Sequence, residues 1–358
     1  MKYFINIFIT TSVTAIIILG VRRLLEDKIS PRWKFVLWGI LGVRLLMPIL
    51  PESNLSIFNT MPRVENIEVE TQTSRTSDLP SEGEDLPARK VSVDSKPYIK
   101  GNISAGERAR EITVSKGFAE TIVVVWLIGS IILLIYFMAV YLIFHVKTRK
   151  LIIAEDTKTL SILEECKEMS GVKADIVVRW GGKTPILKGF LNPQIILPKG
   201  YTDKDLRGIF IHELMHFKHG DTLWNIIGTF LLCLYWYNPL IWLSFSKFRE
   251  DMEILCDYRV LEVYDDRKGY ASVLMKTALA ENTFIMATTS MQNGEKHISK
   301  RVKKIAYFKK PSVIWSSIGV LIAIIIVAVC LTNPIDNAGD RDINRADQLD
   351  YEEIYRHR

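Results

Sequence analysis

The chain has 358 residues, 48% of them hydrophobic, and a mean hydropathy of +0.14, which is more apolar than a soluble protein requires. Its net charge of +6 does not indicate nucleic-acid binding, because the Lys and Arg residues cluster beside apolar segments, as they do in membrane proteins. Four scattered cysteines argue against both a disulfide framework and a cysteine-built metal site: Cys166, Cys233, Cys256 and Cys330.

Two apolar segments open the chain, at 3–21 and 35–50, and the first is long enough to span a bilayer. The short loop region between them is basic: Arg22, Arg23, Lys28, Arg32 and Lys34. A cleaved signal peptide is the alternative for the first segment, but no small-x-small cleavage site leads into a mature domain. We therefore predict two transmembrane helices within 1–50, with the loop inside and the N-terminus outside. Arg44 lies within the second segment, where a charge implies a role, but the sequence does not identify its partner.

Residues 51–117 are polar and lack periodicity, so we predict a poorly ordered extracytoplasmic loop. A third transmembrane helix is predicted at 118–146. Basic residues after it mark the return to the inside: Lys147, Arg149 and Lys150. A last transmembrane helix at 311–332 leads to a short external tail, 333–358, so both termini are expected to be extracytoplasmic.

The largest polar segment, 147–310, predicts a cytoplasmic α+β domain. Its pattern indicates an amphipathic helix at Thr157–Ser170 and a strand from Ala174 to Trp180. Prolines interrupt 184–198, so edge strands or extended segments are expected there, either structural or able to bind a substrate backbone. The polar stretch 281–299 is predicted to be a loop.

The sequence H-E-x-x-H lies in this domain, within the apolar-flanked stretch 211–219. His212 and His216 are four residues apart and therefore lie on one face of a helix, where two imidazoles can share a tetrahedral zinc ion. Glu213 is close enough to hold the attacking water and take its proton. The alternative is an amphipathic helix with solvated side chains, but three of the six histidines fall in this stretch.

Thr202 is a good N-cap for this helix, and Gly220 can end it. His219 lies on the same face as His212 but about 10 Å further along the axis, too far to share one ion. We therefore expect His219 to be a structural or supporting residue, with Asp221 as a candidate partner.

The third ligand must come from elsewhere, and residues 222–246 are apolar enough to form another span. If they crossed the membrane fully, the following helix at 248–257 would lie on the opposite side from the histidines. We therefore predict that 222–246 bends at Pro239 and returns, or is buried in the domain. Glu253 is then the predicted third zinc ligand, and Asp257, four residues later, is predicted to orient a ligating histidine. A solvated helical face is the alternative for this segment.

Three motifs together carry a resemblance to a known family: H-E-L-M-H-x-K-H-x-D at 212–221, Trp236-x-Asn238-Pro239, and Glu253-x-x-Cys256-Asp257. They resemble the BlaR/MecR-type membrane zinc metallopeptidases, the signal transducers of beta-lactam resistance and their sensorless relatives. The likeness covers 1–331, including the order of the spans. It implies a multi-pass α-helical membrane protein with an α+β, gluzincin-type zinc protease domain in the cytoplasm.

The resemblance also implies the roles of site residues: His212, His216 and Glu253 bind zinc and Glu213 is the general base. It implies that an external signal switches the protease, which cleaves itself, a cytoplasmic repressor, or both. The lipid bilayer is the other expected partner; direct nucleic-acid contact is not expected, and a homodimer is left open.

The best-known members carry a penicillin-binding sensor domain after the last span, whereas only 333–358 follow it here. Beta-lactam sensing is therefore not expected, and the loop at 51–117 is the external segment left to receive a signal. Two other functions stay open. One is a housekeeping membrane metalloprotease for protein quality control. The other is a non-catalytic receptor with a structural zinc site, against which Glu213 argues, because a structural site needs no base.

Overall fold

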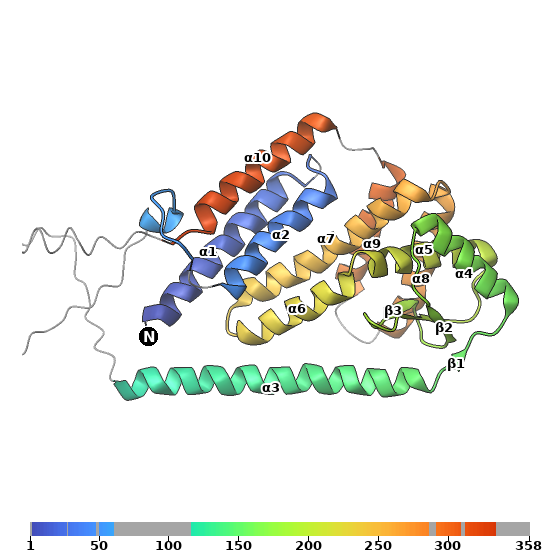
Figure 1. The fold of residues 1–358 in the computed structure, drawn as a ribbon, viewed down its shortest axis with the longest axis horizontal. Coiled ribbons are helices and arrows are strands. Elements are labelled where there is room, and N and C mark those ends of the chain that lie inside the picture. Colours follow the sequence, from blue (N-terminus) through green and yellow to red (C-terminus); the bar gives the residue numbers. More distant parts are fainter. Residues whose placement is uncertain are drawn as a thin grey trace, which may run out of the picture.

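A helical bundle and the mixed α/β domain that the sequence predicts to be the catalytic domain make up the described structure, a computed structural model covering residues 2–26, 28–47, 50–60, 116–285, 291–308 and 312–333. The bundle contains α1 (Lys2–Leu24), α2 (Pro31–Leu46), α6 (Asp221–Leu234), the first half of α7 (Pro239–Val263) and α10 (Val313–Cys330) (Figure 1). Its core is apolar, with Leu37, Leu231 and Ile241 among the buried residues. Two helical segments of the described chain are long and apolar enough to cross a membrane, Phe4–Leu24 and Glu120–Arg149.

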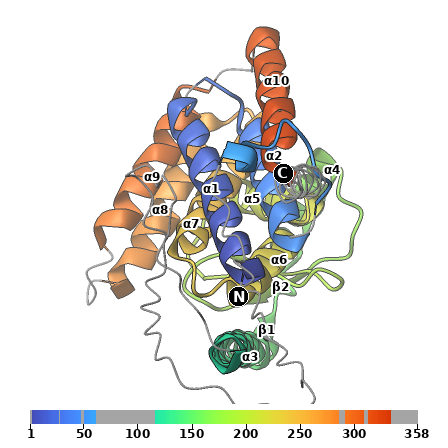
Figure 2. The same cartoon turned by 90° about the vertical axis from the view of Figure 1, so that its left-hand side faces the viewer.

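Helix α3 (Lys116–Arg149) runs alongside this bundle and stands apart from most of it (Figures 1 and 2). It meets the bundle at the tip of the α6–α7 pair, where the Trp126 indole donates to the Leu234 carbonyl at 2.8 Å and the Trp236 indole donates to the Trp126 carbonyl at 3.3 Å. A Cβ at Gly129 would lie 2.6 Å from the Trp236 ring, so this contact requires glycine. The rest of α3 exposes apolar side chains, as a lipid-facing helix would.

The apolar segment 222–246 forms parts of two helices, because the chain reverses direction at 235–238 (Figure 1). Asn238 caps α7 by accepting from the Leu240 amide at 3.0 Å, and Pro239 occupies the first turn, where its missing N–H costs nothing. The Asn238 amide also donates to Ser12 of α1 at 2.9 Å, which ties the turn to the bundle. This reversal returns the second half of α7 to the side of the H-E-x-x-H helix.

The catalytic domain contains a four-stranded sheet in the order β1-β2-β4-β3. Its strands are β1 (Ile152–Ile153), β2 (Val177–Trp180), β3 (Ile186–Lys188) and β4 (Gln194–Leu197). Only β2 and β4 pair in parallel; the other two pairs are antiparallel. The expectation of edge strands throughout 184–198 is therefore wrong for β4, which is an inner strand. Pro193 and Pro198 flank β4 rather than interrupt it, so no ladder hydrogen bond is lost.

Helix α5 (Asp203–Lys218) carries the H-E-x-x-H sequence and packs with α4 (Thr157–Ser170) against the sheet. Thr202 caps it as expected: its hydroxyl accepts from the Asp205 amide, while the Asp205 carboxylate accepts from the Thr202 amide at 2.9 Å. Phe210, Ile211 and Leu214 are fully buried in the core. This packing fixes the rotation of α5 and with it the direction of its histidines.

Helices α8 (Arg267–Ile285) and α9 (Met291–Ala306) correct the prediction of a loop at 281–299. The stretch is polar in composition, but Ile298, Val302 and Ile305 are spaced by four and three residues and so form one apolar face of α9. Ile305 is 1% exposed in the catalytic core. Average polarity therefore concealed an amphipathic helix. Residues 286–290, between the two helices, lie outside the described residues.

The end of the bundle away from the catalytic domain holds the partner of Arg44. Its guanidinium donates to the Asn333 side chain at 3.0 Å and lies 5.0 Å from the centre of the Phe58 ring. Phe58 belongs to a 3-10 helix, η1 (Ile57–Thr60), and residue 52 bridges to Asn333. Most of the predicted loop at 51–117 and of the tail at 333–358 lies outside the described residues.

Candidate active site

Helix α5 brings the two predicted histidines together. The Nε2 atoms of His212 and His216 are 3.1 Å apart, and the rings meet edge to face with centroids 4.6 Å apart. Both side chains are largely buried, with 12% and 13% exposure. The four-residue spacing thus produces the shared face that the sequence predicts.

The other ring nitrogen of His216 has a carboxylate partner. His216 Nδ1 lies 2.7 Å from the Oδ2 atom of Asp221, the first residue of α6, which is 1% exposed. Gly220 permits the sharp change of direction between α5 and α6 because it adopts a left-handed φ of 66°. The carboxylate fixes the proton on Nδ1, which leaves the lone pair on Nε2.

His212 is oriented by a relay from two other helices. The Tyr270 hydroxyl of α8 donates to the Asp257 carboxylate of α7 at 2.6 Å and lies 2.8 Å from His212 Nδ1. Because the hydroxyl proton is committed to Asp257, its oxygen accepts from Nδ1, and the lone pair of His212 is again on Nε2. Asp257 thus reaches His212 through Tyr270, which sequence reasoning missed.

Two lone pairs therefore point at one another across 3.1 Å, which requires a cation between or beside them. The surroundings favour positive charge. Burial opposes protonation of His212, but Cys256 and Glu253 outweigh burial and raise its pKa to about 10. The pKa of His216 is also raised, because Cys256, Glu253 and Asp221 outweigh burial there too.

Glu253 projects from α7 toward this pair. Its carboxylate oxygens lie 3.6 Å from His212 Nε2 and 3.7 Å from His216 Nε2. The donors of a tetrahedral zinc site, each about 2.1 Å from the metal, are about 3.4 Å apart. The separations among these three side chains therefore fit one such ion.

Cys256 lies one turn further along α7 and is a second candidate for the third ligand. His212, His216 and Cys256 offer ligand atoms within 4.8 Å of one another. However, the Sγ atom lies 3.5 Å from Nδ1 of His212, the nitrogen that faces Tyr270, and 3.4 Å from the His212 carbonyl oxygen. The thiol is fully buried, whereas the Glu253 side chain is 33% exposed.

Arg301 of α9 joins the two acidic residues of α7. Its guanidinium donates twice to Asp257, at 2.7 and 2.8 Å, and lies 3.2 Å from Glu253. Sequence reasoning gave Arg301 no role at the site. No local signal could have separated Arg301 from the neighbouring lysines, because its partners are more than 40 residues away.

A cavity of about 490 Å³ opens over the histidines. Glu213, the predicted base, lies in its wall and is 7% exposed. The wall also includes residues 184–187, so the edge strand β3 borders the same space. His219, by contrast, is exposed at the end of α5, and in the described part of the chain no hydrogen bond or ion pair joins it to either imidazole.

Comparison with known proteins identifies the family of the chain. The sequence pattern of the BlaR1 peptidase M56 family matches residues 2–305, which is most of the chain. The chain belongs to this family. M56 proteins are metallopeptidases, so membership supports a metal at the histidine pair.

Individual relatives give the same picture. The chain is 27% identical to the regulatory protein BlaR1 of Bacillus licheniformis over 230 residues, which cover 62% of this chain and 38% of the relative. It is 23% identical to the methicillin resistance mecR1 protein of Staphylococcus aureus over 318 residues, 85% of this chain and 51% of the relative. The regulatory protein BlaR1 of Staphylococcus aureus is 29% identical over 188 residues, 50% of this chain and 32% of the relative. The chain therefore spans about half or less of these relatives' length.

Proposed function

We propose that this M56 chain is a membrane-bound zinc endopeptidase with His212, His216 and Glu253 as ligands and Glu213 as general base. One observation carries the proposal: two Nε2 lone pairs converge at 3.1 Å, with a carboxylate 3.6–3.7 Å from both. Each donor is held by a partner, namely Asp221, Tyr270 or Arg301, as the outer partners of a catalytic zinc site are.

Glu253 is preferred to Cys256 as the third ligand for two reasons. Its oxygens lie beside both converging nitrogens, whereas the Cys256 sulfur lies 3.5 Å from Nδ1 of His212, the nitrogen already bonded to Tyr270. Glu253 also borders the open cavity, so a site built with it keeps a position for water and substrate. The Cys256 sulfur is instead fully buried, lies 3.4 Å from the His212 carbonyl oxygen and does not line that cavity.

The groups that line the cavity have different roles in the proposed reaction. Zinc, when bound, polarises the scissile carbonyl and acidifies the attacking water. Glu213 takes the proton of that water and later passes it to the leaving amine. The free edge of β3 offers backbone donors and acceptors to an extended substrate segment, which would align the peptide bond beside Glu213.

The distribution of basic residues supports a cytoplasmic catalytic domain. Helix α1 ends with Arg22 and Arg23, and α3 ends with Lys147 and Arg149. These ends, together with the starts of α2 and α10, lie toward the catalytic domain (Figure 1). Since short basic segments stay inside, we propose a multi-pass protein with both termini on the external side.

The names of the relatives suggest the physiological setting. BlaR1 is named a regulatory protein and mecR1 a methicillin resistance protein. By analogy, we propose that this chain acts in transmembrane signalling and cleaves itself, a cytoplasmic repressor, or both. This part of the proposal rests on likeness to proteins of which the chain covers about half or less.

The test compares the full-length wild type with Glu213→Gln and His216→Ala in detergent, each incubated with a candidate repressor. Glu213→Gln should keep its zinc and lose cleavage by about 100- to 10,000-fold, because only the proton transfer is removed. His216→Ala should lose zinc as well. Zinc content is measured by elemental mass spectrometry, and the cuts in repressor and protease are mapped by peptide mass spectrometry.

Glu168→Gln on the exposed face of α4 is the matched control and should behave as wild type. A Glu213→Gln protein that cuts at the wild-type rate would remove Glu213 from the mechanism. Broad cleavage of unrelated proteins at the same rate as the repressor would favour a quality-control protease over a signalling one.

A further inference from the structure

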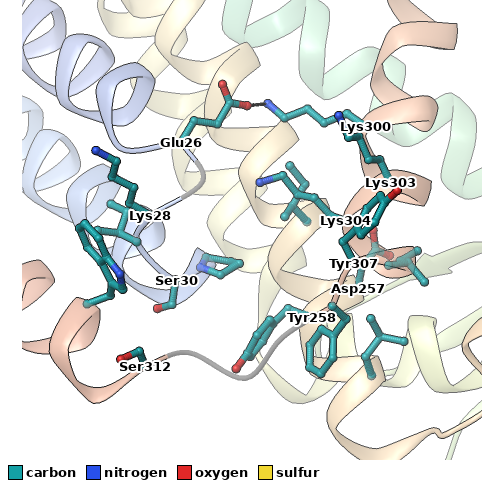
Figure 3. Close-up of a pocket in the computed structure, with 17 residues that line it drawn as sticks. Glu26, Lys28, Ser30, Asp257, Tyr258, Lys300, Lys303, Lys304, Tyr307 and Ser312 are labelled. Carbon is teal, nitrogen blue, oxygen red and sulfur yellow. Dashed lines mark ion pairs between the residues drawn. The ribbon is translucent and has the colours of Figure 1, made fainter.

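A second pocket, separate from the catalytic cavity, lies where the bundle meets the catalytic domain (Figure 3). Its volume is about 830 Å³, in the range of small-molecule sites. The walls come from the α1–α2 loop, α7, the end of α9 and the start of α10. Of the family motifs described above, the Glu253-x-x-Cys256-Asp257 stretch reaches its lining, through Asp257.

The pocket is basic. Its lining contains four lysines and two carboxylates, so cations outnumber anions: Lys28, Lys300, Lys303 and Lys304 against Glu26 and Asp257. Both carboxylates already have partners, since Glu26 pairs with Lys300 and Asp257 with Arg301. Figure 3 shows the first pair across the upper rim, with Lys28 and Lys304 on opposite sides of the space. The lining therefore has positive charge in excess of its own acids.

Two helices also begin at this pocket. Ser30 is the N-cap of α2 and Ser312 the N-cap of α10, and both line the space. Neither serine makes a side-chain capping hydrogen bond. In α2, Pro31 has no N–H and the Trp33 amide donates to the Ser30 carbonyl at 3.1 Å, so the start of α10 is the one that offers its first-turn amides to an external acceptor. Helix starts carry partial positive charge, which adds to that of the lysines and favours an anion.

The same pocket has apolar walls. Ile29 and Ile305 are buried, and Phe308 and Trp315 line the space beside them. The Lys28 ammonium lies 5.8 Å from the centre of the Trp315 ring, and Tyr307 is 74% exposed at the rim. Aromatic residues beside lysines at helix ends are typical of the membrane–water interface. A ligand here would need a negative head and an apolar stem.

We propose that this pocket binds the phosphate headgroup of an anionic phospholipid from the leaflet on the catalytic side. The inference rests on the membrane placement proposed above, since only then do the starts of α2 and α10 lie at lipid headgroup level. Basic pockets between membrane helices are known to take such headgroups. The apolar walls favour a lipid over free phosphate, because free phosphate has no apolar group to pack against them.

Occupancy has a consequence for the active site. Three of the pocket lysines belong to α9, the helix that also carries Arg301, and Asp257 borders both the pocket and the His212 relay. A headgroup held between α9 and the α1–α2 loop would keep α9 in the position from which Arg301 reaches Glu253.

The test uses full-length protein purified from membranes in detergent and stripped of lipid. Phosphatidylglycerol, phosphatidylcholine or inorganic phosphate is then added, and native mass spectrometry measures the bound ligand. The pocket variant is Lys28→Gln with Lys303→Gln, both exposed lysines, and the control is Lys173→Gln with Lys204→Gln, exposed elsewhere on the domain. Zinc content and thermal stability are measured on each sample.

Wild type and control should bind phosphatidylglycerol in preference to phosphatidylcholine, and the pocket variant should bind it at least about tenfold more weakly. Unchanged phosphatidylglycerol binding by the pocket variant would overturn the proposal. Displacement of the lipid by millimolar phosphate would also overturn it and indicate a soluble anion site. If the double variant is less stable than wild type, the single variant Lys303→Gln is measured instead, and it must bind phosphatidylglycerol measurably more weakly than wild type. A failure of zinc binding in the same samples would count against the protease proposal, whereas the measured lipid binding would still test the lipid proposal.

Discussion

The bundle and the catalytic domain both bury charged side chains, but the hydrogen-bond partners of these charges are arranged differently in the two regions. In the bundle, Arg22 of α1 bonds both oxygens of Asp251 of α7, and the Trp38 indole of α2 donates to the same carboxylate at 2.9 Å. One carboxylate therefore holds three helices. In the catalytic domain, charge is distributed over a relay in which every member orients the next, from Arg301 through Asp257 and Tyr270 to His212.

Helix α7 links these two arrangements. Asp251 faces the bundle, whereas Glu253, two residues later, faces the histidine pair. Residues two apart lie on different sides of a helix, so one turn of α7 serves both regions. One short helical segment, Asp251 to Glu253 of α7, therefore joins the bundle to the proposed metal ligand.

Asp251→Asn gives the largest expected effect and tests the bundle side of the comparison. It removes the buried carboxylate that Arg22 bonds twice and leaves that guanidinium with the longer contact to Glu250 at 3.3 Å, which should lower the free energy of unfolding by about 3 kcal/mol. Thermal unfolding in detergent measures the change. Glu262→Gln removes the exposed partner of Arg32 and should cost less than about 1 kcal/mol. Equal losses in the two variants would show that the Arg22–Asp251 contact does not hold the helices together.

Arg301→Lys tests the catalytic side. Lysine keeps the positive charge but loses the two parallel hydrogen bonds to Asp257, so His212 and Glu253 are less well held. We expect zinc affinity to fall by about 10- to 100-fold with little change in thermal stability. A competitive chelator titration measures the affinity. An Arg301→Lys protein with wild-type affinity would mean that Arg301 is only a structural ion pair.

The smallest effect concerns the helix start that positions the histidines. Burial raises the pKa of Asp205, but hydrogen bonds from Lys276 and Thr202 outweigh it and hold that pKa below its ordinary value of 3.8. A pKa lowered by folding adds stability at neutral pH that is lost as the pH falls below about 4. Asp205→Asn should therefore cost about 0.5–1 kcal/mol at pH 7 and less at pH 3. Thermal melts at the two pH values measure this, and a pH-independent loss would contradict it.

Much of the local structure could be predicted from the sequence. The H-E-x-x-H spacing, the Thr202 cap and the helix at Thr157–Ser170 are short-range features whose physics lies within a few residues. Sequence reasoning also singled out Asp221, but as a partner of His219. The structure bonds it to His216, because Gly220 turns α6 back toward the other imidazole.

The long-range partners could not be predicted. Tyr270 and Arg301 lie 58 and 44 residues from the groups they contact, and each belongs to a helix whose rotation is set by packing. Hydropathy averaged over 281–299 hid the apolar face of α9, and with it the element that carries Arg301. Strand β4 was misjudged because prolines beside a strand were treated as prolines within it.

X-ray absorption at the zinc edge of the full-length, zinc-loaded protein tests the central claim most directly, because it counts nitrogen, oxygen and sulfur neighbours of the metal. We predict two imidazole rings and oxygen donors at about 2.0–2.2 Å, with no sulfur. A sulfur neighbour at about 2.3 Å would identify Cys256 rather than Glu253 as the third ligand and would contradict the account.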